Sequence, residues 1–290
     1  MEDLAEKPFA RRKRLTTAVS ETQEIGLFDG KWQGGYFEGN PLDTLGRSSY
    51  FQMGYISVLH ALYQACVRPH MTPQTAALEI GCGRGAWTKT MLGAKEIWCL
   101  DALSAGYNRF WEYVGEQHRH RVRYIQVRDF SCRELPNDHF DFLFSFGTFC
   151  HIRWERQQDY YRNLLSKMRP GATAFVMIAD FDKFNAAVAA YRPLRVSFQR
   201  FSKNVVVTDL LEIAQRIRQK LSSRQDWQGH ADFRLWSERD KEDTTPRPGR
   251  WYHAGLRRTC DFLESIGWEV VNPDVGLCPR DPIVHFRKPL

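Results

Sequence analysis

Several features that mark other classes of protein are missing from this chain of 290 residues. Its seven cysteines include no C-x-x-C pair and their number is odd, which argues against a disulfide framework and a structural zinc site. No apolar run approaches the roughly 20 residues that a membrane-spanning helix needs. The first residues are charged and lack the apolar centre of a signal peptide, so we expect a cytoplasmic protein without a membrane span.

The composition is that of a folded protein with a surplus of positive charge. Hydrophobic residues make up 43% and aromatic residues 13%, which is enough for a substantial core. The net charge of +7 allows an anionic partner, although part of the surplus lies in Arg11–Arg14. We expect residues 1–19 to be a disordered basic leader, where such a run is a solvated tail.

A glycine-rich stretch after a short apolar run is the central motif. Residues 76–80 suit a buried parallel strand, and Gly81, Gly83 and Gly85 follow, with Glu79 two positions before the first glycine. Glycines allow a sharp turn and a close approach of the backbone to a ligand. The spacing G-x-G-x-G differs from the G-x-G-x-x-G of dinucleotide-binding dehydrogenases, which makes an NAD-type oxidoreductase the weaker interpretation.

The stretch Glu79–Gly85 resembles motif I of the class I methyltransferases that depend on S-adenosylmethionine (SAM). Residues 135–145, in the pattern LP-x-x-x-FD-x-x-x-S, and the turn at residues 167–172 resemble two further motifs of that family. The resemblance covers residues 75–178 and 251–287. It implies an α/β fold with a Rossmann-like, doubly wound sheet of seven strands, and SAM as the cofactor, with S-adenosylhomocysteine (SAH) as the product.

The motifs also indicate which residues would bind the cofactor. Asp101 ends a second apolar run about 20 residues after Gly81, where nucleotide-binding domains place a carboxylate on the ribose hydroxyls. The resemblance implies that Asp129 and the amide of Phe130 bind adenine; the alternative for Asp129 is a turn or helix cap. The other expected contacts are Ala102 and Leu103 beside adenine, Ser145 beneath the methionine portion, and Glu79 at the turn or the methionine amino group.

Two histidines are candidates for the base that an oxygen acceptor requires, because histidine has a suitable unperturbed pKa. His151 follows the fourth strand of the motif series, and His253 precedes the last expected helix. A structural role is the alternative for each. Aromatic side chains could stack on an acceptor ring or simply pack in the lid or core; these are Tyr36, Tyr50, Trp251 and Tyr252.

Asp180 and Asp182 follow the fifth strand and raise the question of a divalent metal. Two carboxylates are few for such an ion, and Asp180 could instead cap the next helix, so we expect no metal site.

The chain divides into five expected parts. The leader is followed by an N-terminal lid and helix (20–74), with Ser48 and Ser49 as possible N-caps for a helix from about Tyr50 to Val67. The SAM-binding core (75–180), an inserted cap that helps form the acceptor pocket (181–250), and a final helix with a β-hairpin (251–290) complete it. Helices are also expected at residues 87–92, 105–116 and 209–221.

The sequence therefore predicts a SAM-dependent methyltransferase acting on a hydroxyl oxygen of a small molecule, such as a sugar-type or natural-product acceptor. Residues 182–250 carry an excess of five positive charges, which favours a polar or anionic acceptor, although it could equally be a solvated face. N- or C-methylation, an RNA substrate and a catalytically silent SAM-binding partner protein remain alternatives. Nucleic-acid amine methyltransferases carry the pattern N/D-P-P-Y/F/W after the fourth strand, and this chain has Ser145–Thr148 there instead. The sequence therefore argues against a nucleic-acid substrate.

Overall fold

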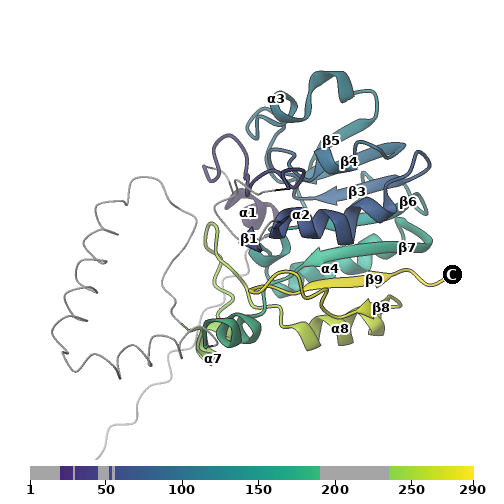
Figure 1. Cartoon of the computed structure of the whole chain (residues 1–290). Helices are drawn as coiled ribbons and strands as arrows, with labels where there is room; N and C mark the ends of the chain where they lie inside the picture. Colours follow the sequence, from purple (N-terminus) through teal and green to yellow (C-terminus); the bar gives the residue numbers. More distant parts are fainter. Residues whose placement is uncertain (1–19, 29, 45–51, 54–55, 190–234) are drawn as a thin grey trace, which may run out of the picture.

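A sheet of seven strands forms the centre of the protein, in the order β5-β4-β3-β6-β7-β9-β8 (Figure 1). The computed structural model describes residues 20–28, 30–44, 52–53, 56–189 and 235–290. The expected leader, the predicted helix at 209–221 and most of the expected cap lie outside the described residues. The strands are β3 (Ala76–Ile80), β4 (Glu96–Asp101), β5 (Val122–Gln126), β6 (Phe140–Ser145), β7 (Met168–Met177), β8 (Glu269–Asn272) and β9 (Ile283–Arg287).

The sheet has the topology that the motifs predict. Strands β3 to β7 pair in parallel, and β9 is antiparallel to both β7 and β8. Every residue of β3 is buried, which explains why its sequence is continuously apolar apart from Glu79. The prediction of a doubly wound, seven-stranded α/β fold is confirmed.

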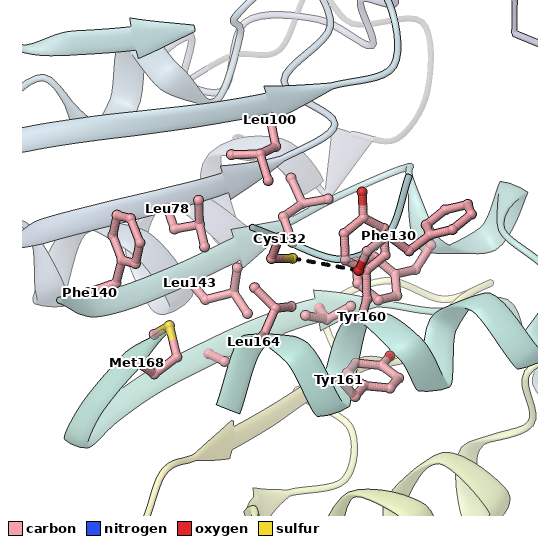
Figure 2. Packing of buried hydrophobic residues seen from close by; sticks show 14 of the residues in the cluster. Leu78, Leu100, Phe130, Cys132, Phe140, Leu143, Tyr160, Tyr161, Leu164 and Met168 are labelled. Carbon is pink, nitrogen blue, oxygen red and sulfur yellow. Dashed lines mark hydrogen bonds between the residues drawn. The ribbon is translucent and has the colours of Figure 1, made fainter. Parts of the chain in front are cut away.

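Alternate side chains of the strands enter two separate apolar cores, one on each face of the sheet. On one face, Leu78 and Leu143 pack against α4 (Trp154–Leu165) and α8 (Leu256–Ser265). Figure 2 shows this packing, with Tyr160 and Leu164 of α4 turned toward the strands. On the other face, Ala77 lies in the core that α2 (Val58–Leu62) and α3 (Phe110–Val114) cover. Helices also form at α1 (Glu21–Gly26), at α7 (Glu238–Glu242) and over residues 181–189.

The expected helix from about Tyr50 begins later in the structure. Two short strands, β1 (Gln52–Met53) and β2 (Ile56–Ser57), pair antiparallel, and α2 starts only at Val58. Ser57 caps it by accepting a hydrogen bond from the amide of His60, at 3.1 Å. The helix then continues as a π-helical turn, Tyr63–Val67. Tyr50 and the proposed caps Ser48 and Ser49 lie outside the described residues.

Two other predicted helices are shorter than expected, for local reasons. After the glycines only a 3₁₀ turn forms, Thr88–Met91, where the Thr90 hydroxyl donates to the Trp87 carbonyl at 2.6 Å and competes with helical bonding. The helix expected from residue 105 starts at Phe110, because Arg109 adopts a left-handed φ of 50° that cannot continue a helix. In the described part of the chain no helix is long and apolar enough to cross a membrane.

Candidate active site

A turn built on three glycines follows β3. Gly81, Gly83 and Gly85 have φ values of 75°, 52° and 96°, in the left-handed region that favours glycine. A Cβ at Gly81 would lie 1.8 Å from the Thr148 hydroxyl oxygen, and one at Gly83 would lie 2.8 Å from the carbonyl oxygen of Tyr36. Only glycine therefore allows the turn to pass so close to its neighbours.

A first cavity lies beside this turn, at the carboxyl ends of β3, β4 and β6. In doubly wound sheets this edge is where ligands bind. The walls come from the turn, from the segments that follow the strands, and from the N-terminal segment before β1. The lining residues are Ile25, Phe28, Trp32, Tyr36, Ile80, Gly81, Gly83, Leu100, Asp101, Ala102, Leu103, Asn108, Val127, Phe130, Gly147, Thr148, His151, Ile152 and Tyr160.

Asp101 is fixed at the floor of the first cavity by two backbone amides. Its Oδ2 accepts a hydrogen bond from Gly83 N at 2.8 Å, and its Oδ1 accepts one from Leu103 N at 2.9 Å. Asp101 is 8% exposed, and this burial raises the pKa of its carboxyl. Because each carboxylate oxygen has more than one lone pair, Asp101 can accept further hydrogen bonds from a ligand in the cavity.

Of the pair expected at adenine, only Phe130 lines the first cavity. The carboxylate of Asp129 accepts hydrogen bonds from the Ser131 amide at 2.9 Å and hydroxyl at 2.5 Å, and forms an ion pair with Arg133. The Phe130 amide donates a long hydrogen bond of 3.4 Å to Glu21 of α1. The structure thus shows Asp129 organising its own turn.

Three of the expected cofactor residues lie behind the turn. Glu79 accepts a hydrogen bond from the Thr88 hydroxyl at 2.5 Å, and burial raises its pKa to about 8. The Ser145 hydroxyl donates to the carbonyl of Ile80 at 2.8 Å. A Cβ at Gly85 would meet Val114 and Phe110 rather than the cavity. Within the described structure, none of the three is part of either cavity wall.

The N-terminal segment, residues 20–28 and 30–40, lines the first cavity and is bound to the rest of the protein by an ion pair and by hydrogen bonds. Glu24 of α1, 3% exposed, pairs with Arg153 at 2.5 Å. Beyond α1, Arg84 of the glycine turn donates to the carbonyl of Gly34 at 2.6 Å, and its amide donates to the carbonyl of Tyr36 at 3.2 Å. These bonds place Trp32 and Tyr36 in the cavity wall.

A second cavity adjoins the first. The two share Tyr36, Gly147 and His151, so they meet at the end of β6. The second cavity is largely apolar. Its lining residues are Tyr36, Glu38, Val58, Leu59, Phe146, Gly147, Cys150, His151, Met177, Trp251, Cys278 and Arg280.

His151 lies at the junction of the two cavities in a defined tautomer. Its Nδ1 lies 3.0 Å from the carbonyl oxygen of Arg250, which can only accept, so Nδ1 carries the proton. Burial lowers the pKa of the imidazole to about 4, and the ring is neutral near pH 7. Nε2 is then left with its lone pair, which can accept a hydrogen bond from a hydroxyl. The rings of Trp32 and Trp251 pack against the imidazole, with centroids at 5.2 and 6.0 Å.

The other candidates for catalysis and acceptor binding divide between the cavities and the core. Within the described structure His253 lines neither cavity; its Nδ1 accepts a hydrogen bond from the Phe181 amide at 3.0 Å. Tyr252 is 5% exposed, and its hydroxyl donates to the Thr245 carbonyl at 3.3 Å. Of the four aromatic candidates, Tyr36 and Trp251 line the second cavity. Tyr50 lies outside the described residues.

Asp180 acts as a helix cap in the structure. Its Oδ1 accepts hydrogen bonds from the amides of Asp182 and Lys183, and its Oδ2 accepts one from Leu256 at the start of α8, at 2.7 Å. The described residues contain no group of three or more histidine, cysteine, aspartate or glutamate side chains that could hold a metal ion. All seven cysteines are free thiols.

Glu38 is an ionisable group of the site that sequence analysis did not identify. It lines the second cavity, and burial raises its pKa to about 7, against the lowering effect of a hydrogen bond with Tyr36. Its only signal in the sequence is a single acid among the aromatic and glycine residues of 34–39. Arg280 was also missed, because it lies in a loop far along the chain.

Because the pKa of Glu38 is raised on folding, Glu38→Gln is expected to stabilise the protein more at high pH than at low pH. The folded protein keeps the proton between the ordinary pKa of 4.5 and about 7, so stability is lost as pH rises through this range. The difference in unfolding free energy between the variant and wild type should be about 2 kcal/mol more favourable to the variant at pH 8 than at pH 5, since one pKa unit is worth about 1.4 kcal/mol. Urea unfolding at both pH values measures this.

The matched control for that measurement is Glu264→Gln, on the outer face of α8. An equal gain at pH 5 and pH 8 for Glu38→Gln, or the same pH dependence in the control, would contradict the raised pKa.

Parts of this chain are similar to known proteins in sequence and in fold. Residues 77–171 match the family model described as a methyltransferase domain. A protein from Listeria monocytogenes described as a SAM-dependent methyltransferase is 13% identical, with a TM-score of 0.51 over 80% of this chain and 98% of that one. Magnesium protoporphyrin IX methyltransferase from Synechocystis, with bound SAH, is 12% identical, with a TM-score of 0.45 over 79% of this chain and 80% of that one. No curated protein matches the sequence.

The sheet order, the glycine turn and the cavity at the strand ends define an α/β fold of the class I methyltransferase type. The match to the methyltransferase domain, residues 77–171, includes the glycine turn, Asp101 and His151. SAM is the cofactor that this domain implies.

Proposed function

We propose that the protein transfers the methyl group of SAM to a hydroxyl oxygen of a small molecule. The first cavity would hold SAM and the second the acceptor. The observation that carries the proposal is the junction of the two cavities at Tyr36, Gly147 and His151. Methyl transfer from a sulfonium is an in-line displacement, so holding the two reactants in adjoining, water-excluding sites supplies most of what catalysis needs.

The residues of the first cavity fit this cofactor. Gly81 and Gly83 bring bare backbone to the cavity wall, at positions where a Cβ would collide with neighbouring residues. Asp101 would accept the ribose hydroxyls, and Ala102, Leu103 and Phe130 would flank adenine. Asp129 would hold the turn that places Phe130 beside adenine, rather than meet the adenine amino group itself, while Glu79, Gly85 and Ser145 would support the glycine turn from behind.

In the second cavity, His151 is the proposed acceptor of the hydroxyl proton. Its Nε2 has the lone pair, and its position at the junction is where the transferred methyl group would pass. Tyr36 and Trp251 would pack against the acceptor. The polar segment 182–250, with its excess of five positive charges, favours a polar or anionic acceptor. His253 and Tyr252 would support this region without touching the acceptor.

Calorimetric titration of the purified protein with SAH, and with NADH as the control, tests the proposal. We expect micromolar or tighter binding of SAH, since the first cavity offers a carboxylate for the ribose and an apolar wall for adenine. NADH should not bind. If SAH failed to bind after removal of any copurified ligand, the proposed function would be wrong.

The acceptor atom needs a second measurement, because N- and C-methylation, an RNA substrate or a silent binding role would all leave SAH binding intact. Methyl transfer from labelled SAM should reach hydroxylated small molecules and spare their amine and nucleic-acid counterparts. The free, mostly buried thiols fit a reducing compartment such as the cytoplasm.

A further inference from the structure

Arg280, in the loop between β8 and β9, is held rigidly at the wall of the second cavity. Its Nε donates a hydrogen bond of 2.7 Å to the carboxylate of Asp281, which is 1% exposed. Its guanidinium carbon lies 4.0 Å from the centroid of the Trp251 ring. An ion pair and a stacked aromatic ring therefore fix the plane of the guanidinium before any ligand binds.

The loop that carries Arg280 is itself anchored. Lys183 donates to the backbone carbonyl of Asp281 at 3.4 Å and pairs with Asp274 at 2.5 Å. The carbonyl of Pro282 accepts a hydrogen bond from the amide of Ile178 at 3.1 Å, at the end of β7. The sheet thus supports the loop, and Arg280 has little freedom to swing away from the cavity.

Asp281 occupies only one of the donors of Arg280. The guanidinium has five N–H groups, and the terminal nitrogens carry four of them. Among the described residues, the hydrogen bond to Asp281 is the one that Arg280 donates. The two terminal nitrogens of a guanidinium can bind a carboxylate or a phosphate through two parallel hydrogen bonds.

The remaining wall strengthens such a contact. Most lining side chains are apolar, and burial raises the pKa of the Cys150 and Cys278 thiols, which keeps them uncharged near pH 7. A charge pair is stronger where polar groups and water are few. Glu38 is the carboxylic acid of this wall, and its pKa of about 7 leaves it partly protonated near neutrality.

We propose that Arg280 binds an acid group of the acceptor, so that the substrate is a hydroxylated organic acid. The acid group would lie against the guanidinium, the carbon skeleton between Trp251 and Phe146, and the hydroxyl toward His151. This inference rests on the proposed function of the second cavity. The competing occupant is an ammonium compound held by Glu38 and the aromatic rings. Arg280 is charged at every pH of interest, and the whole chain has a net charge of +7. Both favour an acid over an ammonium compound.

The test uses matched ligands with the full-length protein saturated with SAH. Calorimetry would compare three hydroxy acids (lactate, 3-hydroxybenzoate and 4-hydroxyphenylacetate) with the corresponding neutral amides and with amines of the same skeleton. We expect at least one acid to bind about tenfold or more tightly than its amide, because the hydrogen bonds to a charged group are lost in the amide. In Arg280→Gln this preference should disappear.

Variants of Arg280 and matched controls distinguish a loss of acid binding from a loss of folding. Arg280→Gln leaves the buried Asp281 unpaired, so the double variant Arg280→Gln, Asp281→Asn removes the pair together. Arg257→Gln, with a side chain that is 95% exposed on α8, loses one positive charge and should keep the preference for the acid. SAH affinity within about threefold of wild type shows that each variant is folded and that the first cavity is intact.

Each outcome decides between explanations. Equal binding of acid and amide, tighter binding of the amine, a preference that survives in Arg280→Gln, or binding of no ligand in the panel by the SAH-bound protein would overturn the inference and leave the proposed function standing. Failure of the wild-type protein to bind SAH would instead overturn the proposed function.

Discussion

Asp101→Asn is expected to weaken SAH binding about 30-fold or more, since hydrogen bonds to a charged group contribute about 1.5–3 kcal/mol each and the ribose diol would make two. Asparagine keeps one oxygen for the backbone amide of Leu103 or Gly83, so the turn survives better than with alanine, which would leave both buried amides without a partner. Calorimetric titration with SAH measures the change, and urea unfolding reports on the fold.

The control for this prediction is Asp159→Asn on α4, where the carboxylate forms ion pairs with Arg156 and Arg162 away from both cavities. It should bind SAH like wild type. If Asp101→Asn also bound SAH within threefold of wild type, Asp101 would have no role at the ribose.

His151→Ala is expected to lower kcat about 100-fold, the usual contribution of a positioned acid–base group, and to leave SAH affinity within about threefold. The loss should be the same from pH 6 to pH 9, because the pKa of about 4 keeps the imidazole neutral throughout that range. The measurement is steady-state turnover with SAM and an acceptor that the hydroxylated panel identifies.

Two further variants distinguish proton transfer from simple positioning. His151→Gln retains an acceptor oxygen but cannot take a proton, so it should be as slow as the alanine variant. His253→Gln, a matched change outside both cavities, should keep most of the activity. A His151→Gln enzyme as fast as wild type would transfer the proposed role to Glu38 or to proximity alone.

The strands were predictable because their pattern is local. β3 occupies the predicted residues 76–80 and β4 ends at Asp101, as the second apolar run predicts, since buried parallel strands need continuous apolar runs and the glycines mark where the first one ends. Helix starts were less predictable. Ser48, Ser49 and Ser57 are equivalent as capping residues in the sequence, and only the pairing of β1 with β2 places the start of α2 at Val58.

The site was predictable only where a motif carried it. Asp101 and the glycines stand at fixed offsets from a strand, whereas Glu38 and Arg280 come from opposite ends of the chain and meet only after folding. The pKa of Glu38 is a product of that packing, so no spacing in the sequence could indicate it. His151 and His253 looked alike in sequence, and the contact of His253 with the Phe181 amide depends on tertiary structure.

The shared wall of the two cavities bears on inhibitor design. Because Tyr36, Gly147 and His151 belong to both, one compound that joins an adenosine group to an acidic fragment by a short linker could occupy both cavities at once. The second fragment would then bind at an effective concentration in the millimolar range, set by the linker, instead of at its concentration in bulk solution. Such a compound would contact the shared residue Tyr36 from both cavities, so its dissociation would be slow compared with that of either fragment alone.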